Sequence, residues 1–134
     1  MPKELDPELR ERLLREAEGA LDRSYAPYSS FHVGAAILTG SGRIQAAANV
    51  ECASYGLSCC AERSAIFAAV AAEGPDLRID AVAVATRPAA VAAPCGACRQ
   101  VIWEFGREAV VLYPGEEGVC ERTIAELLPA GFIL

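Results

Sequence analysis

Two short cysteine motifs constrain this chain more than any other feature. The first contains Cys60 and Glu62, and the second contains Cys95 and Cys98. Cys95 and Cys98 are three residues apart at a predicted helix start, so one helical turn directs both sulfurs toward a single point. Cys60 can supply a third sulfur from another helix, with Glu62 close enough to face the same point. A fold that uses all three sulfurs must bring the starts of two helices together.

Three thiols in this arrangement predict a zinc site. Zinc prefers a tetrahedral set of ligands, and three protein ligands leave one position for water, as in a catalytic rather than a closed structural site. A thioredoxin-like dithiol formed by Cys95 and Cys98 is an alternative, because a helix dipole lowers the pKa of the first thiol. That alternative gives no reason for a glutamate to follow Cys60.

A structural zinc site is the second alternative, with Cys59 or Cys120 as a fourth ligand. Neighbouring residues on a helix point about 100 degrees apart, so Cys59 and Cys60 cannot easily share one ion. We therefore interpret Cys52, Cys59 and Cys120 as packing residues or free thiols. His32 lies in a predicted strand and is interpreted as a structural residue rather than a ligand.

Glu62 and Arg63 are unusual in the predicted helix that follows Cys60, because that helix is otherwise largely apolar. A buried carboxylate is costly without a partner, and a zinc-bound water would be such a partner for Glu62. An adjacent guanidinium can hydrogen-bond a sulfur and offset the negative charge of three thiolates. Arg63 is therefore a candidate to support the metal ligands, with a surface ion pair as the alternative.

Composition limits the function further. The 134 residues, 14.1 kDa, predict one domain over 1–134, and a hydrophobic content of 53% is enough for a core. The net charge is -6, and no cluster of Lys and Arg stands out. We therefore expect a small uncharged substrate and no nucleic acid partner. The charged segment 1–6 predicts neither a secretory signal nor a membrane anchor, so we expect a cytoplasmic protein.

Hydrophobic periodicity and turn residues predict a three-layer α/β/α domain with a mixed five-stranded sheet. The expected helices cover 7–21, 60–72, 95–105 and 123–128. The expected strands cover 32–39, 43–49, 79–86, 109–113 and 119–122, with a turn at 114–118. The helix over 60–72 is apolar on nearly all sides, which predicts that it is buried.

The chain resembles the cytidine deaminases of the small, homotetrameric type over residues 25–132. The resemblance rests on six segments: Tyr25-Ala26-Pro27-Tyr28-Ser29-Ser30-Phe31, Val33-Gly34-Ala35-Ala36, Asn49-Val50-Glu51, Cys60-Ala61-Glu62-Arg63-Ser64-Ala65, Pro94-Cys95-Gly96-Ala97-Cys98-Arg99-Gln100-Val101 and Glu126-Leu127-Leu128-Pro129-Ala130-Gly131-Phe132. The two cysteine motifs define the wider deaminase superfamily. The Asn-x-Glu and Leu-Leu-Pro-x-x-Phe segments narrow it to nucleoside deaminases.

The resemblance implies a reaction and a set of roles. Cytidine and 2′-deoxycytidine would be hydrolysed to uridine and 2′-deoxyuridine in pyrimidine salvage, with one zinc ion per subunit held by the three cysteines. Glu62 would carry the protons. The substrate would be contacted by seven residues: Phe31 at the pyrimidine, Asn49 and Glu51 at the ribose 3′-hydroxyl, the backbone of Ala61 and Pro94 at the base edge, and Tyr55 and Phe132 from a neighbouring subunit of a homotetramer.

Two positions and two other functions qualify this interpretation. Cys52 stands where the family commonly has asparagine, and His32 stands where the family varies. Blasticidin S deaminase is the nearest enzymatic alternative, but the Asn-x-Glu pattern with Glu51 favours a plain nucleoside. A non-enzymatic structural zinc module is the alternative from another class.

Overall fold

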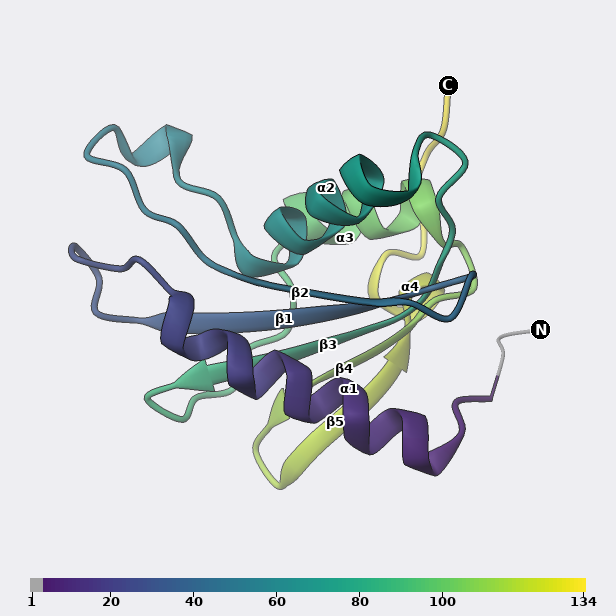
Figure 1. Cartoon of the computed structure of the whole chain (residues 1–134), viewed down its shortest axis with the longest axis horizontal. Coiled ribbons are helices and arrows are strands. Elements are labelled where there is room, and N and C mark those ends of the chain that lie inside the picture. Colours follow the sequence, from purple (N-terminus) through teal and green to yellow (C-terminus); the bar gives the residue numbers. More distant parts are fainter. Residues whose placement is uncertain (1–3) are drawn as a thin grey trace.

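The computed structural model describes residues 4–134, and within them the chain forms helices on both sides of one sheet (Figure 1). The strands are β1 (His32–Thr39), β2 (Ile44–Ala48), β3 (Ile79–Arg87), β4 (Val110–Gly115) and β5 (Gly118–Thr123). The helices are α1 (Pro7–Gly19), α2 (Ala61–Glu73), α3 (Gly96–Phe105) and α4 (Ile124–Leu127), with 3-10 turns at Ala20–Arg23 (η1) and Tyr55–Leu57 (η2). The expectation about the charged segment 1–6 falls partly outside the described residues.

The sheet has five strands in the order β2-β1-β3-β4-β5. Strands β3 and β4 are parallel, while β1 pairs with both β2 and β3 in the antiparallel sense, and so does β4 with β5. The parallel pair requires a crossover, which α3 provides between β3 and β4. The predicted mixed five-stranded sheet is confirmed.

Two hydrophobic cores lie on the two faces of the sheet. Figure 1 shows α1 on one face and α2 with α3 on the other. Successive side chains of a strand point to opposite faces, and β1 follows this alternation: Ala35 and Ile37 join the core beneath α2, whereas Ala36 and Leu38 pack with Leu13 of α1. The three-layer α/β/α arrangement is therefore confirmed, and the helices on the two faces of the sheet both bury residues of β1.

Helix α1 lies directly against the backbone of β1. A Cβ atom added to Gly34 would lie 2.0 Å from the carbonyl oxygen of Ala17. Only glycine allows this approach, because any side chain would overlap with a backbone atom. Gly34 therefore sets the distance between α1 and the sheet.

The ends of some elements differ from the prediction. The first helix ends at Gly19 and continues as the 3-10 turn η1. The β4–β5 turn is shorter than predicted, since Gly115 already pairs with Gly118 and the latter takes the left-handed φ of 113°. Pro114 is tolerated in β4 because pairing with β3 ends at Leu112, so its missing N–H breaks no bond on that side.

The predicted burial of α2 is correct for only one side of the helix. Ala65, Ile66 and Ala69 are fully buried, but Phe67 is 51% exposed. The sheet covers one face of α2, and no second layer covers the other within residues 4–134. In the same part of the chain, no helix combines the length and apolar character that crossing a membrane requires.

Candidate active site

The N-terminal ends of α2 and α3 meet on one face of the sheet and bring three cysteines together. Cys60 is the N-cap of α2, Cys95 is the N-cap of α3, and Cys98 lies in the first turn of α3. Their Sγ atoms all lie within 4.8 Å of one another, and those of Cys60 and Cys95 are 3.8 Å apart. Cys98 is fully buried, whereas Cys95 is exposed. The structure thus assembles the three thiols that the sequence selects.

The spacing of the sulfurs fits a zinc ion. Two sulfurs bound to a tetrahedral zinc at about 2.3 Å each would lie about 3.8 Å apart. The distance between Cys60 and Cys95 has this value. Among the described residues no further cysteine, histidine or carboxylate joins the cluster, so three protein ligands leave a fourth position open. The predicted cofactor, one zinc ion per subunit, therefore fits the residues present.

Hydrogen bonds within the cluster and from Arg63 favour the thiolate form of Cys60. The hydrogen bond with Cys98 is the main cause that lowers the pKa of the Cys60 thiol to about 5, and Arg63 acts in the same direction. Arg63 Nη2 lies 3.4 Å from Cys60 Sγ. The thiolate is the form that binds zinc. Arg63 therefore lies where the sequence predicted it, with its guanidinium beside a candidate zinc ligand.

Glu62 is a buried carboxylate beside the thiols. It is 5% exposed and lies in the first turn of α2, where the helix dipole favours negative charge. Burial is the main cause that raises the pKa of Glu62, and the charge of Cys60 adds to it. A carboxyl group whose pKa is raised accepts a proton more readily than an ordinary carboxylate, which suits a group that must carry protons in both directions.

A cavity of about 270 Å³ opens in front of these groups. Its lining includes Cys60, Glu62 and Cys95 together with Asn49 and Glu51. A second hollow of about 380 Å³, formed with Tyr28 and Tyr55, shares Glu51 and Ser58 with the first. The metal candidates and the polar residues of the Asn-x-Glu segment therefore face the same space.

Glu51 is held in place by the loop before β1. Its carboxylate accepts hydrogen bonds from the backbone N–H groups of Tyr28 (2.9 Å) and Ser29 (3.1 Å), and also from the Ser29 hydroxyl. The Ser29 hydroxyl is the main cause that lowers the pKa of Glu51. Glu51 is therefore an oriented carboxylate at the edge of the cavity.

The other predicted substrate residues lie at different distances from the cavity. Ala61 lines it, and Pro94 is buried beside Cys95. Phe31 is half-buried and is not among the residues that line either hollow. Tyr55 is 73% exposed at the rim, and Phe132 is 63% exposed near the C-terminus.

Sequence reasoning missed two residues that support the site. Ser29 orients Glu51, as described above. Arg99 donates from Nε to the carbonyl of Pro94 (2.8 Å) and from Nη1 to the carbonyl of Leu127 (2.9 Å), so it ties the cysteine loop to α4. Arg99 lies on α3 five residues after Pro94, and this spacing could have indicated its contact with the cysteine loop. No pattern in the sequence indicated the contact of Ser29 with Glu51.

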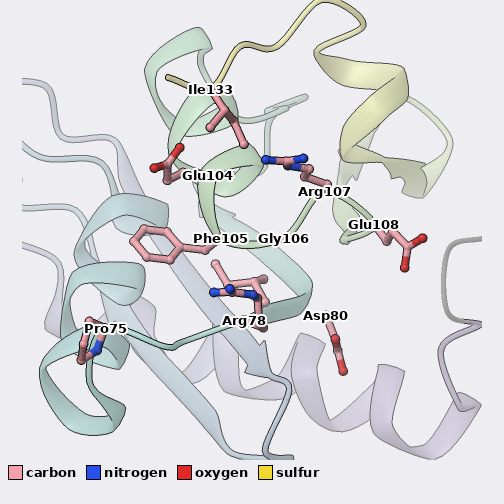
Figure 2. A pocket seen from close by; sticks show the side chains of 10 residues that line it. Pro75, Arg78, Asp80, Glu104, Phe105, Gly106, Arg107, Glu108 and Ile133 are labelled. Carbon is pink, nitrogen blue, oxygen red and sulfur yellow. The ribbon is translucent and has the colours of Figure 1, made fainter.

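A cavity larger than either of these two hollows lies elsewhere and contains none of the predicted site residues. It measures about 620 Å³ and lies between the segment that leads into β3 and the C-terminal end of α3. Figure 2 shows Arg78, Phe105 and Arg107 around it, together with three acidic side chains. Size alone therefore does not identify the functional site in this fold.

Comparisons with known proteins agree with the geometry of the cysteine cluster. Residues 7–114 match the family described as the cytidine and deoxycytidylate deaminase zinc-binding region. The cytidine deaminase of Halalkalibacterium halodurans is 42% identical over 125 residues, which cover 92% of this chain and 93% of that protein. The blasticidin-S deaminase of Bacillus cereus is 33% identical over 106 residues, which cover 73% of this chain and 74% of that protein.

The fold is shared as well. The crystal structure of cytidine deaminase from Mycobacterium tuberculosis superposes with a TM-score of 0.82 at 36% identity, covering 98% of this chain and 100% of that one. The family match includes all three cysteines and Glu62, and the structural match extends over both helices that carry them. The chain belongs to the zinc-binding cytidine and deoxycytidylate deaminase family.

Proposed function

We propose that this protein hydrolyses cytidine and 2′-deoxycytidine to uridine and 2′-deoxyuridine with release of ammonia, in pyrimidine salvage. The observation that carries the proposal is the buried carboxylate of Glu62 in the first turn of α2, on the wall of a cavity that it shares with two of the three clustered cysteines. A structural zinc site needs no such carboxylate, and its burial would only destabilise the fold.

The cysteines and Glu62 divide the chemistry between them. Cys60, Cys95 and Cys98 would hold zinc, which supplies a nucleophile near neutral pH by lowering the pKa of water. Glu62 takes a proton from the water and delivers it to N3 of the cytosine ring, which makes C4 more electrophilic. After oxygen bonds to C4, Glu62 would take the remaining proton from that oxygen, which becomes the C4 carbonyl, and pass it to the amine. The C4–N bond then breaks and ammonia leaves, so one carboxylate performs both transfers.

The proposed substrate contacts are those that the family resemblance implies, and the cavity lining supports three of them, Asn49, Glu51 and Ala61. Asn49 and Glu51 would bind the ribose 3′-hydroxyl, and both line the cavity at a short distance in sequence from the cysteines. The backbone of Ala61 and Pro94 would contact the edge of the base. Phe31 would reach the pyrimidine, a role that requires its half-buried ring to turn toward the cavity.

We further propose a homotetramer of single-domain subunits, located in the cytoplasm, in which neighbouring subunits complete each site. The support is apolar surface: Tyr55, Phe67 and Phe132 are all at least half exposed in the single chain. Exposed aromatic side chains near a cavity are typical of protein interfaces. Tyr55 and Phe132 would cover the cavity of a neighbour, while Phe67 would pack between subunits.

The second candidate is blasticidin S deamination, which the Bacillus cereus relative favours. It uses the same chemistry at the cysteines, so only the far side of the cavity separates the two functions. Glu51, oriented by Ser29 and Tyr28, favours a sugar hydroxyl as the group to be bound. We therefore place the plain nucleosides first.

The test is turnover by the purified protein with matched variants. We expect loss of cytidine absorbance with stoichiometric uridine and ammonia, and a lower rate with blasticidin S. Glu62→Gln should keep zinc and lower kcat by about 10²- to 10⁴-fold, the usual contribution of acid–base catalysis. A zinc-loaded protein that turns over no cytosine compound, or a Glu62→Gln variant with unchanged kcat, would contradict the proposal.

A further inference from the structure

The side-chain amide of Asn49 has only one possible orientation. The backbone N–H of Val33 donates to Asn49 Oδ1 at 2.9 Å, and Asn49 Nδ2 donates to the carbonyl of Phe31 at 2.9 Å. A backbone N–H can only donate and a carbonyl can only accept, so oxygen and nitrogen of the amide cannot be exchanged. The amide nitrogen carries two N–H groups, and Phe31 accepts from one of them. Within residues 4–134 no hydrogen bond uses the second, which leaves it for a ligand in the cavity that Asn49 lines.

Two further side chains, Ser24 and His32, form a chain of hydrogen bonds that ends at the oxygen of this amide. Ser24 Oγ contacts Asn49 Oδ1, and because Oδ1 can only accept, the hydroxyl must donate. The same Ser24 oxygen lies 2.8 Å from His32 Nδ1. With its proton directed to Asn49, Ser24 can only accept from His32, so the proton of His32 lies on Nδ1. The donors therefore run from His32 to Ser24 to Asn49.

Backbone pairing and an ion pair hold the segment that carries Ser24 against the segments that carry Asn49 and His32. The backbone of Tyr25 pairs with the segment around Asn49, through Tyr25 N to Asn49 O (3.0 Å) and Glu51 N to Tyr25 O (2.9 Å). Just before Ser24, Asp22 forms an ion pair with Arg87 at 3.0 Å. Arg87 is the β3 residue opposite His32, so η1 is fixed to the same strands that carry the histidine.

Ser24 and His32 are not part of the cavity lining, whereas Asn49 is. Both are half-buried; His32 Nδ1 contacts Ser24 Oγ, and Ser24 Oγ contacts Asn49 Oδ1. Their hydrogen bonds restrict the rotation of an amide whose remaining N–H is the group that a substrate hydroxyl would meet. This orientation costs nothing at the moment of binding, which is how preorganisation increases affinity.

We propose that Ser24 and His32 are positioning residues of the sugar subsite, which hold the Asn49 amide toward the 3′-hydroxyl of the nucleoside. The inference rests on the proposed contact between Asn49 and that hydroxyl. It assigns a function to the His32 imidazole, for which the sequence indicated only a structural role.

The test compares kcat/KM for cytidine and for 3′-deoxycytidine, which lacks the hydroxyl in question. Ser24→Ala removes the donor to Asn49, and Ser24→Thr restores a hydroxyl. His32→Phe keeps a ring without a donor, and His32→Asn places an N–H near the position of Nδ1. We expect Ser24→Ala and His32→Phe to lower kcat/KM for cytidine about tenfold, as for one lost hydrogen bond, but to leave that for 3′-deoxycytidine within about twofold. Ser24→Thr and His32→Asn should recover most of the loss.

Thermal melting and zinc content show whether each variant folds. If a variant at one position does not fold, the pair of variants at the other position still tests the inference. Equal losses on both substrates, or no loss on either, would overturn the inference while leaving deamination intact. A wild-type enzyme that does not distinguish the two substrates would instead show that the proposed Asn49 contact is wrong, and the inference would fall with it.

Discussion

Arg63 Nη2 lies 3.4 Å from the sulfur of Cys60, three residues before it in the sequence at the start of α2. The hydrogen bond to Cys60 is the main cause that raises the pKa of the arginine. Three thiolates on one zinc ion carry a net charge of about -1, and the guanidinium offsets it. The contact therefore places a cationic side chain of α2 beside a candidate metal ligand.

The first prediction concerns this contact. Arg63→Gln should weaken zinc binding about 10- to 100-fold, as is usual when a group that supports a metal ligand is removed. Competition with a chromogenic chelator measures the affinity. Arg12→Gln, on the exposed surface of α1, is the matched control and should leave it unchanged. An unchanged affinity in Arg63→Gln would mean that the contact is only a surface interaction.

The second prediction separates ligands from other cysteines. Cys98→Ala removes a buried sulfur of the cluster and should reduce bound zinc from one equivalent to almost none, with loss of activity. Cys120→Ala changes a half-buried cysteine outside the cluster and should retain one equivalent. Metal analysis of the purified variants decides the matter; stoichiometric zinc in Cys98→Ala would contradict the ligand assignment.

The third prediction compares the substitution of glycine by alanine at two positions, one packed against α1 and one open to solvent. Gly34→Ala should lower the free energy of unfolding by about 1–3 kcal/mol or more, because the new methyl group would overlap with the carbonyl of Ala17. Gly19→Ala, at a helical φ of -60° with no atom within 4 Å of the added carbon, should raise it by about 0.4–1 kcal/mol. Urea denaturation measures both. Equal signs would show that α1 does not lie this close to β1 in solution.

The fourth prediction is a pH dependence at the start of α4. The Glu126 carboxylate accepts hydrogen bonds from the backbone N–H (3.0 Å) and the hydroxyl (3.1 Å) of Thr123, and the backbone bond is the main cause that lowers its pKa below 4.5. A group with a lowered pKa in the folded state stabilises the protein above its unfolded pKa, and this contribution is lost as the pH falls through the folded value.

The difference in unfolding free energy between wild type and Glu126→Gln should therefore be largest at neutral pH. It should become smaller when the pH is lowered well below 4.5. Denaturation of both proteins at each pH makes the measurement, and release of zinc in acid cancels because it affects both. A difference that stays constant with pH would show that the carboxylate is not bound by Thr123 in solution.

Local patterns in the sequence determined the elements and the identity of the metal site. Periodicity identifies strands and helices because each buries one face or both, and the helical spacing of Cys95 and Cys98 predicts that their sulfurs point in a common direction. The presence of a glutamate and an arginine in an otherwise apolar helix selected Glu62 and Arg63 as candidate site residues, and the structure places both beside the cysteines. These features depend only on neighbours along the chain.

Only the tertiary structure decided which groups share a cavity. Cys60 and Cys95 are separated by helix α2, strand β3 and two loops, yet their sulfurs lie 3.8 Å apart because α2 and α3 pack on the same face of the sheet. The orientation of the Asn49 amide depends on donors from Val33 and Ser24, which approach through strand pairing and the turn η1. Side-chain direction at a site is fixed by hydrogen-bond partners distant in sequence, and no local pattern encodes them.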